Sequence, residues 1–295
     1  YDLRLYVTAT SANPMKVYLH KEGYARFCSE RFDLSRIQDL FRHVTNSNFQ
    51  KFHSEYDLNA QSQRENPLGN KWHIDTVREH WRKLGPGTDA KIWQRIQDAI
   101  MRAFVMFESI GFDTSRRLVK HEGNCFCMFG IDVLIDSKLQ PWVLELNGVP
   151  STGTNSPLDI QIKTAVVGDL LSLLGLCTQD PAEAQKQARS QLYSLLTFTR
   201  KVAVDCVTLH ASTEAGRKGR CITNKDEIRR ILQRALGQKQ VSDKDVDAIW
   251  QWEVEKSRGR GWEPVYPSPS MGKFQPMLSY RPMNNLFLSW ITNNM

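Results

Sequence analysis

Hydrophobic side chains near the start of the chain recur in short runs broken by turn residues, a pattern typical of an antiparallel sheet. The runs predict strands over residues 1–10, 16–19 and 24–28. The pairs Asn13-Pro14 and Glu22-Gly23 are typical of turns, so we expect them to separate these strands. A polar stretch over 46–70, rich in Asn, Gln, Ser and Lys, then predicts a long exposed loop.

Apolar residues later in the chain recur every three to four positions, which predicts helices. We expect these helices over residues 75–84, 89–110, 157–174, 182–196, 225–236 and 244–256. Ser242 and Asp245 form a capping-box pattern just before the last of them. The stretch 257–276 contains four prolines and is expected to lie extended on the surface, whereas the apolar segment 286–290 predicts a short packed helix.

Two apolar, β-prone runs over 129–136 and 141–148 predict a hairpin that carries oxygen-bearing side chains. Asp132 lies on its first strand, and Glu145 and Asn147 share one face of the second because they are two residues apart. Carboxylate and amide oxygens in such a cluster suit Mg²⁺. The spacing alone fits a second interpretation equally well, in which Asp132 caps a turn and Glu145 faces solvent.

With 295 residues and 41% hydrophobic content, the chain can bury a core and form one large or two ordinary domains. No run approaches the roughly eighteen apolar residues of a membrane span. Tyr1 opens the chain inside a predicted strand, without an initiator Met or a basic leader, so we expect the start to lie within a longer protein. The six scattered cysteines predict reduced thiols and no zinc site.

The net charge of +7 is concentrated in the last two-fifths of the chain. Residues 1–177 hold 21 basic and 20 acidic side chains, whereas residues 178–295 hold 18 and 12. This excess favours a polyanionic partner, with a solvated helical face as an equally weighted alternative. The basic region lacks interleaved exposed aromatics and any reading motif, which argues against nucleic acid.

Cationic and oxygen-bearing side chains accompany the hairpin in the first part of the chain. They are Asp2 and Arg4 on the first predicted strand, Arg26 on the third, and His43, Thr45 and Asn46 at the entry to the polar loop. Arginine forks match phosphate oxygens, so Arg4 and Arg26 could bind a phosphate from one face of the sheet. Taken singly, each arginine is more typical of a protein surface, and His43 is more typical of a core.

Five ordered blocks in the chain together resemble the tubulin tyrosine ligase-like family. They are Asp-x-Arg-x-Tyr-Val at 2–7, Gly-x-x-Arg-Phe at 23–27, His-hydrophobe-Thr-Asn at 43–46, Phe-Gly-x-Asp at 129–132 and Pro-Trp-hydrophobe-Leu-Glu-hydrophobe-Asn at 141–147. The segment 156–163 and the basic extension are most similar to the tubulin polyglutamylase branch. Two departures concern Ser47-Asn48, where most relatives have Tyr-Ser, and Gly148-Val149-Pro150-Ser151, which is closer to the tyrosine ligase itself.

The resemblance implies an α/β (α+β) fold with two parts. Residues 1–179 would be the C-terminal portion of an ATP-grasp ligase core with an antiparallel sheet, and its N-terminal portion would precede Tyr1. Residues 180–295 would form a mainly helical, basic extension that docks tubulin or microtubules. A cytoplasmic, cytoskeletal location follows, including the cilium or basal body.

The same resemblance implies an ATP- and Mg²⁺-dependent ligase that joins free L-glutamate to glutamate side chains in the acidic tails of tubulin. ATP would phosphorylate the acceptor carboxylate, and the incoming amine would attack the acyl phosphate. A tubulin glycylase, another amino-acid ligase of the family, or a catalytically silent microtubule-binding relative are the alternatives. Neither nucleic acid nor membrane insertion is expected.

Site residues follow from the resemblance position by position. Asp132, Glu145 and Asn147 would bind Mg²⁺. Arg4 would contact the γ-phosphate of ATP, and Asp2, His43, Thr45 and Asn46 would line the nucleotide and the reaction centre, with Arg4 and His43 catalytic. Arg26, Lys51 and Lys163 would bind the carboxylates of the incoming glutamate, and Ser47 would form part of the pocket wall.

Overall fold

The computed structural model describes residues 1–12, 14–54, 56, 69–108, 126–176, 225–236, 241–278, 285–287 and 289–291. The described chain divides into two compact units, one of residues 1–7, 20–99 and 128–166 and one of residues 8–19, 100–127 and 167–295. The helix predicted over 182–196 and the domain boundary predicted at 180 lie outside the described residues. That boundary therefore stays a prediction.

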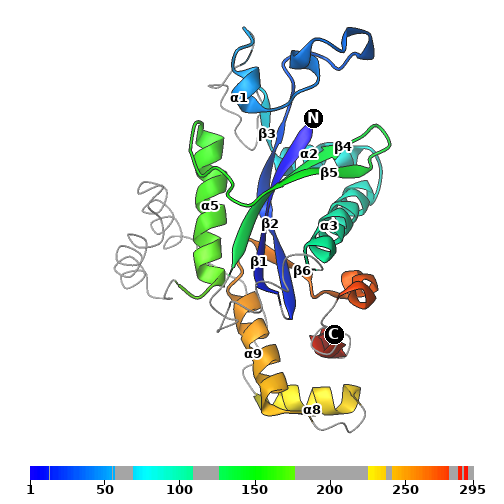
Figure 1. The fold of residues 1–295 in the computed structure, drawn as a ribbon, viewed down its shortest axis with the longest axis vertical. Coiled ribbons are helices and arrows are strands. Elements are labelled where there is room, and N and C mark those ends of the chain that lie inside the picture. Colours follow the sequence, from blue (N-terminus) through cyan, green and yellow to red (C-terminus); the bar gives the residue numbers. More distant parts are fainter. Residues whose placement is uncertain are drawn as a thin grey trace. The chain divides into compact units, whose positions relative to one another are not determined.

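A sheet of six strands forms the centre of the fold (Figure 1). The strands are β1 (Asp2–Ala12), β2 (Met15–Arg26), β3 (Lys71–His73), β4 (Cys127–Ile135), β5 (Pro141–Asn147) and β6 (Trp262–Tyr266). Their order is β3-β2-β1-β4-β5, and β6 pairs with β2. The pairs β2–β3 and β4–β5 are antiparallel, so the predicted mixed α/β class with an antiparallel sheet is confirmed.

The predicted turn at Glu22-Gly23 is wrong, because β2 runs without a break from Met15 to Arg26. A Cβ on Gly23 would lie 2.8 Å from the carbonyl oxygen of Arg4 and 3.0 Å from the Leu5 side chain. Gly23 therefore allows β1 and β2 to approach closely within the sheet. In the sequence alone, a glycine that permits a close strand contact cannot be distinguished from a glycine in a turn.

Helices account for most of the remaining regular structure. They are α1 (Ser47–Gln50), α2 (Ile74–Lys83), α3 (Thr88–Phe107), α5 (Pro157–Leu173), α8 (Lys225–Ala235) and α9 (Asp243–Ser257), with 3₁₀ turns η1 (Leu34–Arg36), η2 (Leu40–Arg42) and η5 (Pro269–Met277). Five of the six predicted helices are thus confirmed. The capping box of Ser242 and Asp245 begins α9, and Gly175 follows α5 with φ of 73°, the left-handed conformation that ends many helices.

In the first unit, side chains of β1 alternate between a buried apolar face and a charged face. Leu3, Leu5 and Val7 are fully buried, whereas Asp2 and Arg4 point to the opposite face. The apolar stripes of α2 and α3 supply further core residues, which include Ile74, Trp81, Ile92 and Ile96. The charged side chains of β1 thus lie on the face of the strand opposite to this apolar core.

In the second unit, the stretch predicted to be extended on the surface is instead partly buried. Trp262, Val265 and Tyr266 are at most 2% exposed, and β6 pairs with β2. Proline is found mainly in edge strands, where no ladder hydrogen bond is lost, and β6 contains Pro264. Helices α8 and α9 and the apolar residues Leu286, Phe287 and Trp290 share one hydrophobic cluster, as the pattern over 286–290 predicts. None of the described helices combines the length and apolar content that a membrane crossing requires.

Candidate active site

Charged side chains from five neighbouring strands lie in a line across one face of the sheet. We call this set the charged row; its members are Lys71 on β3, Arg26 on β2, Asp2 and Arg4 on β1, Asp132 on β4 and Glu145 on β5. Strand register places Lys71 opposite Arg26 and Glu145 opposite Asp132. Ion pairs join the members between these ends. The sheet therefore aligns residues that are up to 143 positions apart in sequence.

Asp132 and Arg4 form a bidentate pair at the centre of the charged row. Arg4 donates from Nε to Oδ1 and from Nη2 to Oδ2, the latter at 2.9 Å. Burial acts to raise the pKa of Asp132, but hydrogen bonds and charge from Arg4 and Arg26 outweigh it and hold the pKa below its ordinary value. Asp132 is thus ionised although it is only 3% exposed.

Arg26 bridges two buried carboxylates. Its Nε donates to Oδ1 of Asp2 at 3.0 Å, and its Nη2 contacts Oδ2 of Asp2 and lies 2.7 Å from Oδ2 of Asp132. Burial acts to lower the pKa of Arg26, but the hydrogen bond and charge of Asp2 and the charge of Asp132 raise it. Arg26 therefore places one positive charge between two carboxylates that would otherwise repel each other.

The β4–β5 hairpin brings its oxygen-bearing side chains to one place, as its sequence predicts. Asp132 pairs with Glu145 and Gly130 pairs with Asn147, and Asn147 Nδ2 donates to Glu145 Oε1 at 2.9 Å. The register shifts between Asp132 and Val133, so Leu144 has no partner. Such a bulge re-aims side chains, and here Glu145 and Val143 lie on opposite faces.

The oxygen donors at this end of the charged row fit Mg²⁺. Asp132 and Glu145 contribute carboxylates and Asn147 an amide oxygen, which are the hard ligands that Mg²⁺ takes. No group of three or more His, Cys, Asp and Glu side chains able to hold a metal occurs among the described residues. Mg²⁺ commonly uses few protein ligands and completes its shell with water and phosphate oxygens.

Gly130 is a site residue that the sequence pattern alone did not single out. An added Cβ would lie 2.9 Å from Cβ of Pro150 and 3.3 Å from Cδ of Arg4. The absence of a side chain therefore leaves room for the Arg4 stem to reach Asp132. Its signal in the sequence is a glycine two residues before Asp132 within a predicted strand.

Gly130→Ala should destabilise the protein by about 1–3 kcal/mol, because Arg4 or Pro150 must move to relieve the overlap. Gly148→Ala is the matched control, since the nearest atom to its Cβ would be 4.0 Å away on Phe129. Urea unfolding of both variants measures the difference. Equal stability for the two would contradict the packing role of Gly130.

At the other end of the charged row, two lysines share one buried carboxylate. Nζ of Lys71 lies 3.2 and 3.0 Å from the two oxygens of Asp159, which is 1% exposed, and Nζ of Lys163 lies 3.6 Å from Oδ1. Lys163 also donates to the carbonyl oxygen of Gly153. Burial, assisted by the charge of Lys71, lowers the pKa of Lys163, although Asp159 opposes this shift. Lys71 was missed in the sequence, where a single lysine after a polar loop carries no signal.

A model of the tubulin-tyrosine ligase family matches residues 1–187 of the chain. The chain belongs to this family. Its relatives include human tubulin polyglutamylase TTLL5, 33% identical over 203 residues that make up 68% of this chain and 16% of the relative. Human tubulin monoglutamylase TTLL4 is 30% identical over 276 residues, which are 91% of this chain and 22% of the relative.

A third relative, Caenorhabditis elegans tubulin polyglutamylase ttll-4, is 27% identical over 290 residues, which are 98% of this chain and 45% of the relative. The chain therefore spans less than half the length of each of these three relatives. Their names confirm the predicted resemblance to the glutamylase branch of the tubulin-tyrosine ligase family.

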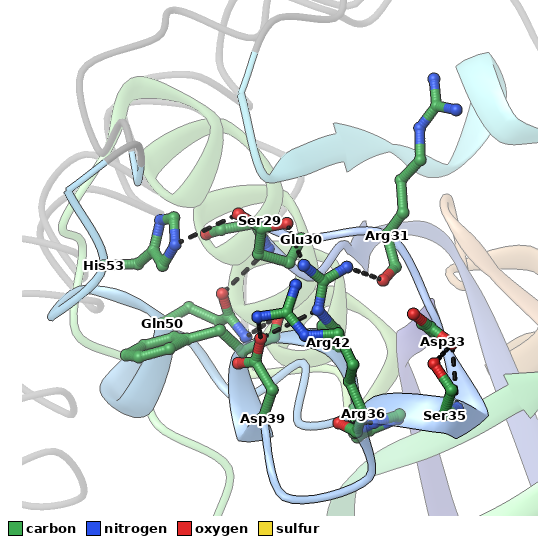
Figure 2. A network of polar contacts seen from close by, with 12 residues as sticks. Ser29, Glu30, Arg31, Asp33, Ser35, Arg36, Asp39, Arg42, Gln50 and His53 are labelled. Atoms are coloured by element: carbon green, nitrogen blue, oxygen red, sulfur yellow. Dashed lines mark hydrogen bonds and ion pairs between the residues drawn. The ribbon is translucent and has the colours of Figure 1, made fainter.

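In this member of the tubulin-tyrosine ligase family, the segment that carries His43, Thr45, Asn46, Ser47 and Lys51 is held by its own polar network (Figure 2). Arg42 donates to Asp39 at 2.8 Å and to the carbonyl oxygen of Arg31 at 2.8 Å, and it pairs with Glu30 at 2.9 Å. The buried Gln50 accepts from the Ser29 backbone and donates to the carbonyl oxygens of Phe41 and Val44.

The site residues predicted in this segment have local contacts. Nε2 of His43 lies 3.3 Å from the Arg36 carbonyl oxygen, Asn46 accepts from the Asn48 backbone at the start of α1, and Lys51 lies over the Phe52 ring. Within the part of the chain that the structure describes, none of the five forms a hydrogen bond or ion pair with the charged row. Their roles at the nucleotide and the amino acid stay predictions.

Asp132→Asn should make the acid limb of the stability curve shallower. The pKa of Asp132 is depressed in the folded state, so its contribution is complete above the unfolded pKa of about 3.9 and is lost as the pH falls through the folded value. The variant should be less stable at pH 7 and lose less stability below about pH 4. Urea unfolding at pH 7, 4 and 3 tests this, and parallel curves for the two proteins would contradict it.

Proposed function

We propose that this chain supplies the metal- and substrate-binding part of an ATP-dependent ligase that adds L-glutamate to glutamate side chains of tubulin. The observation that carries the proposal is the charged row, which places two arginines between an oxygen-rich end and a lysine-rich end. The glutamylase names of the relatives support the choice of tubulin and glutamate. The expected location is the cytoskeleton.

A carboxylate reacts poorly with an amine, and the proposed reaction overcomes this by first phosphorylating the carboxylate. A carboxylate oxygen of the acceptor attacks the γ-phosphorus of ATP, the bond to the bridging oxygen breaks, and ADP leaves. The α-amine of glutamate, after losing a proton, then attacks the acyl carbon and expels phosphate, so that an amide forms. Mg²⁺ supplies charge neutralisation at the transferred phosphoryl group.

In this proposal Arg4 would bind the transferred phosphoryl group. Its guanidinium already makes a bidentate contact with a carboxylate, and phosphate oxygens offer the same geometry. A phosphate at Arg4 would leave Oδ1 of Asp132 available to Mg²⁺, while Oδ2 keeps its contact with Arg26. Glu145 and Asn147 would be further ligands. Arg4 and the metal would thus stabilise the same developing negative charge from two sides.

The positive charge of the C-terminal part of the chain also supports an acidic acceptor. Residues 178–295 hold 18 basic and 12 acidic side chains, an excess that suits the acidic tails of tubulin. This docking role rests largely on residues outside those that the structure describes. Weaker tubulin binding at higher salt, without binding to RNA, would support it.

The test incubates the complete natural polypeptide with ATP, Mg²⁺ and tubulin, and offers each isotopically labelled amino acid separately. Mass spectrometry of the tubulin should show added glutamate and no addition without ATP. Addition of glycine alone would replace the proposal with a glycylase. Retained microtubule binding with no addition of any amino acid would indicate a catalytically silent relative.

A further inference from the structure

The strand β3, which places Lys71 in the charged row, has only three residues and lies at one end of the strand order. A strand this short has few backbone hydrogen bonds to hold it. A slip of one residue would turn its side chains to the other face of the sheet, and Lys71 would leave the charged row. The position of Lys71 therefore depends on the contacts that hold the two ends of β3.

Different contacts hold the two ends of β3. At the first end, Asn70 accepts from the Phe27 backbone at 2.8 Å, and its Nδ2 donates to the Phe27 carbonyl oxygen at 3.2 Å. The last residue, His73, is 1% exposed, and its ring contacts two neighbouring elements. Nε2 lies 2.6 Å from Oε2 of Glu22 on β2, and Nδ1 accepts from the Asp75 backbone at 3.1 Å as the N-cap of α2.

These two contacts determine which nitrogen of His73 carries the proton. A backbone N–H can only donate, so Nδ1 is unprotonated, and the proton of the neutral ring lies on Nε2 and is donated to Glu22. Glu22 is 7% exposed, so this bond from a ring N–H to a carboxylate is inside the protein, where such bonds are strong. One neutral ring thus joins β3 to both β2 and α2.

Protonation of His73 would change one of its two contacts and keep the other. A hydrogen on Nδ1 would prevent that nitrogen from accepting the Asp75 N–H, whereas Oδ2 of Asp75, 3.9 Å from Nδ1, is near enough to accept the new N–H after a small rotation. Nε2 would donate to Glu22 in both states. Histidine commonly changes charge between about pH 5 and 8, so the cap of α2 should depend on pH and the joint to β2 should not.

The groups near this ring allow it to become charged although it is buried. The titratable and charged groups come from four elements and are His20, Glu22 and Tyr24 on β2, Lys71 on β3, Asp75 on α2 and Asp159 on α5, which pairs with Lys71. The carboxylates of Glu22 and Asp75 lie on the two sides of the ring, so an imidazolium there would be compensated.

We infer that His73 is a positioning residue for the charged row: its Nε2–H, bonded to Glu22, keeps Lys71 in place, and its Nδ1 caps α2 only while the ring is neutral. The inference rests on the proposed function for the role of the charged row in the reaction. The two contacts of the ring can be tested without that function.

Amide hydrogen exchange of the complete natural polypeptide, read by mass spectrometry, tests the inference without requiring turnover. After correction for intrinsic exchange, the first amides of α2 should exchange about three- to tenfold faster at pH 5.5 than at pH 8, because the cap is lost, whereas those of β3 should change less than about twofold. His80→Asn, at an exposed histidine of α2, is the control and should keep this pH dependence. Exchange in α2 that is the same at both pH values in the wild type would overturn the inference.

Two variants separate the roles of the two ring nitrogens. His73→Asn keeps an acceptor near the position of Nδ1 but is too short to reach Glu22 and does not titrate. Its α2 amides should stay protected at both pH values, while its β3 amides exchange about tenfold faster. His73→Gln keeps a donor near the position of Nε2, so its β3 amides should exchange within about threefold of wild type, while the start of α2 is unprotected even at pH 8. Equal exchange patterns in the two variants would overturn the inference.

Glutamate addition to tubulin, measured alongside, links the positioning role to the reaction. His73→Asn should slow addition by about tenfold, and His73→Gln should restore it to within about threefold of wild type. A wild-type rate of addition by His73→Asn would overturn the positioning role. Absence of addition by the wild type itself would instead contradict the proposed function, and the exchange pattern would still report on His73.

Discussion

Glu145→Gln should reduce amino-acid transfer to tubulin by on the order of 100-fold or more, because it would remove a charged ligand from the proposed Mg²⁺ site. The fold should be almost unaffected. Glu145 is exposed, and Asn147 donates to it a hydrogen bond that a glutamine oxygen can also accept. We expect the free energy of unfolding to change by less than about 0.5 kcal/mol.

Glu79→Gln is the matched control, since Glu79 is an exposed glutamate on α2 in the same compact unit. It should transfer glutamate at the wild-type rate. Rates of labelled glutamate incorporation at several Mg²⁺ concentrations would distinguish the two variants, because only Glu145→Gln should require more Mg²⁺. Wild-type transfer by Glu145→Gln would contradict the assignment of the metal site.

Arg26→Gln should be the most destabilising change in the charged row, by about 3–5 kcal/mol. Arg26 is 8% exposed and separates the carboxylates of Asp2 and Asp132, which are 1% and 3% exposed. Without the guanidinium, Asp2 loses its counter-ion and Asp132 keeps Arg4 only, so one buried negative charge is left uncompensated at a cost of several kcal/mol. Urea unfolding at pH 7 measures the loss.

Two further variants show whether the cause is charge. Adding Asp2→Asn to Arg26→Gln removes the carboxylate that has lost its counter-ion, so the double variant should be more stable than Arg26→Gln alone. Arg36→Gln, at an arginine side chain that is 59% exposed, should change stability by less than about 0.5 kcal/mol. If Asp2→Asn gave no recovery, the bridging role of Arg26 would be wrong.

The periodicity of apolar residues predicted the strands and helices whose two faces differ in polarity. It gave wrong predictions where a glycine or proline had an uncommon structural role. The hairpin of β4 and β5 and the helices α2, α3, α5, α8 and α9 follow directly from alternation or helical spacing. Gly23 was taken for a turn residue, although it permits a close strand contact. The prolines over 257–276 argued against a strand, so the periodicity did not predict β6, which pairs with β2.

Residue types predicted part of the site, but strand order and register were needed to assemble it. The ordered motifs identified Arg4, Arg26, Asp132 and Glu145, and the sheet places them in one row. Lys71 joins them only because β3 pairs with β2 in a particular register. No periodicity encodes that pairing, and none encodes the bulge that turns Glu145 toward Asp132.

The most direct test of the central claim follows one oxygen atom through the reaction. An acidic tubulin-tail peptide with ¹⁸O in its glutamate side-chain carboxylates is incubated with the complete natural polypeptide, ATP, Mg²⁺ and L-glutamate. If the acceptor carboxylate is phosphorylated, each phosphate released with amide formation should carry one ¹⁸O from the peptide. Phosphate that stays unlabelled while glutamate is added would contradict the account.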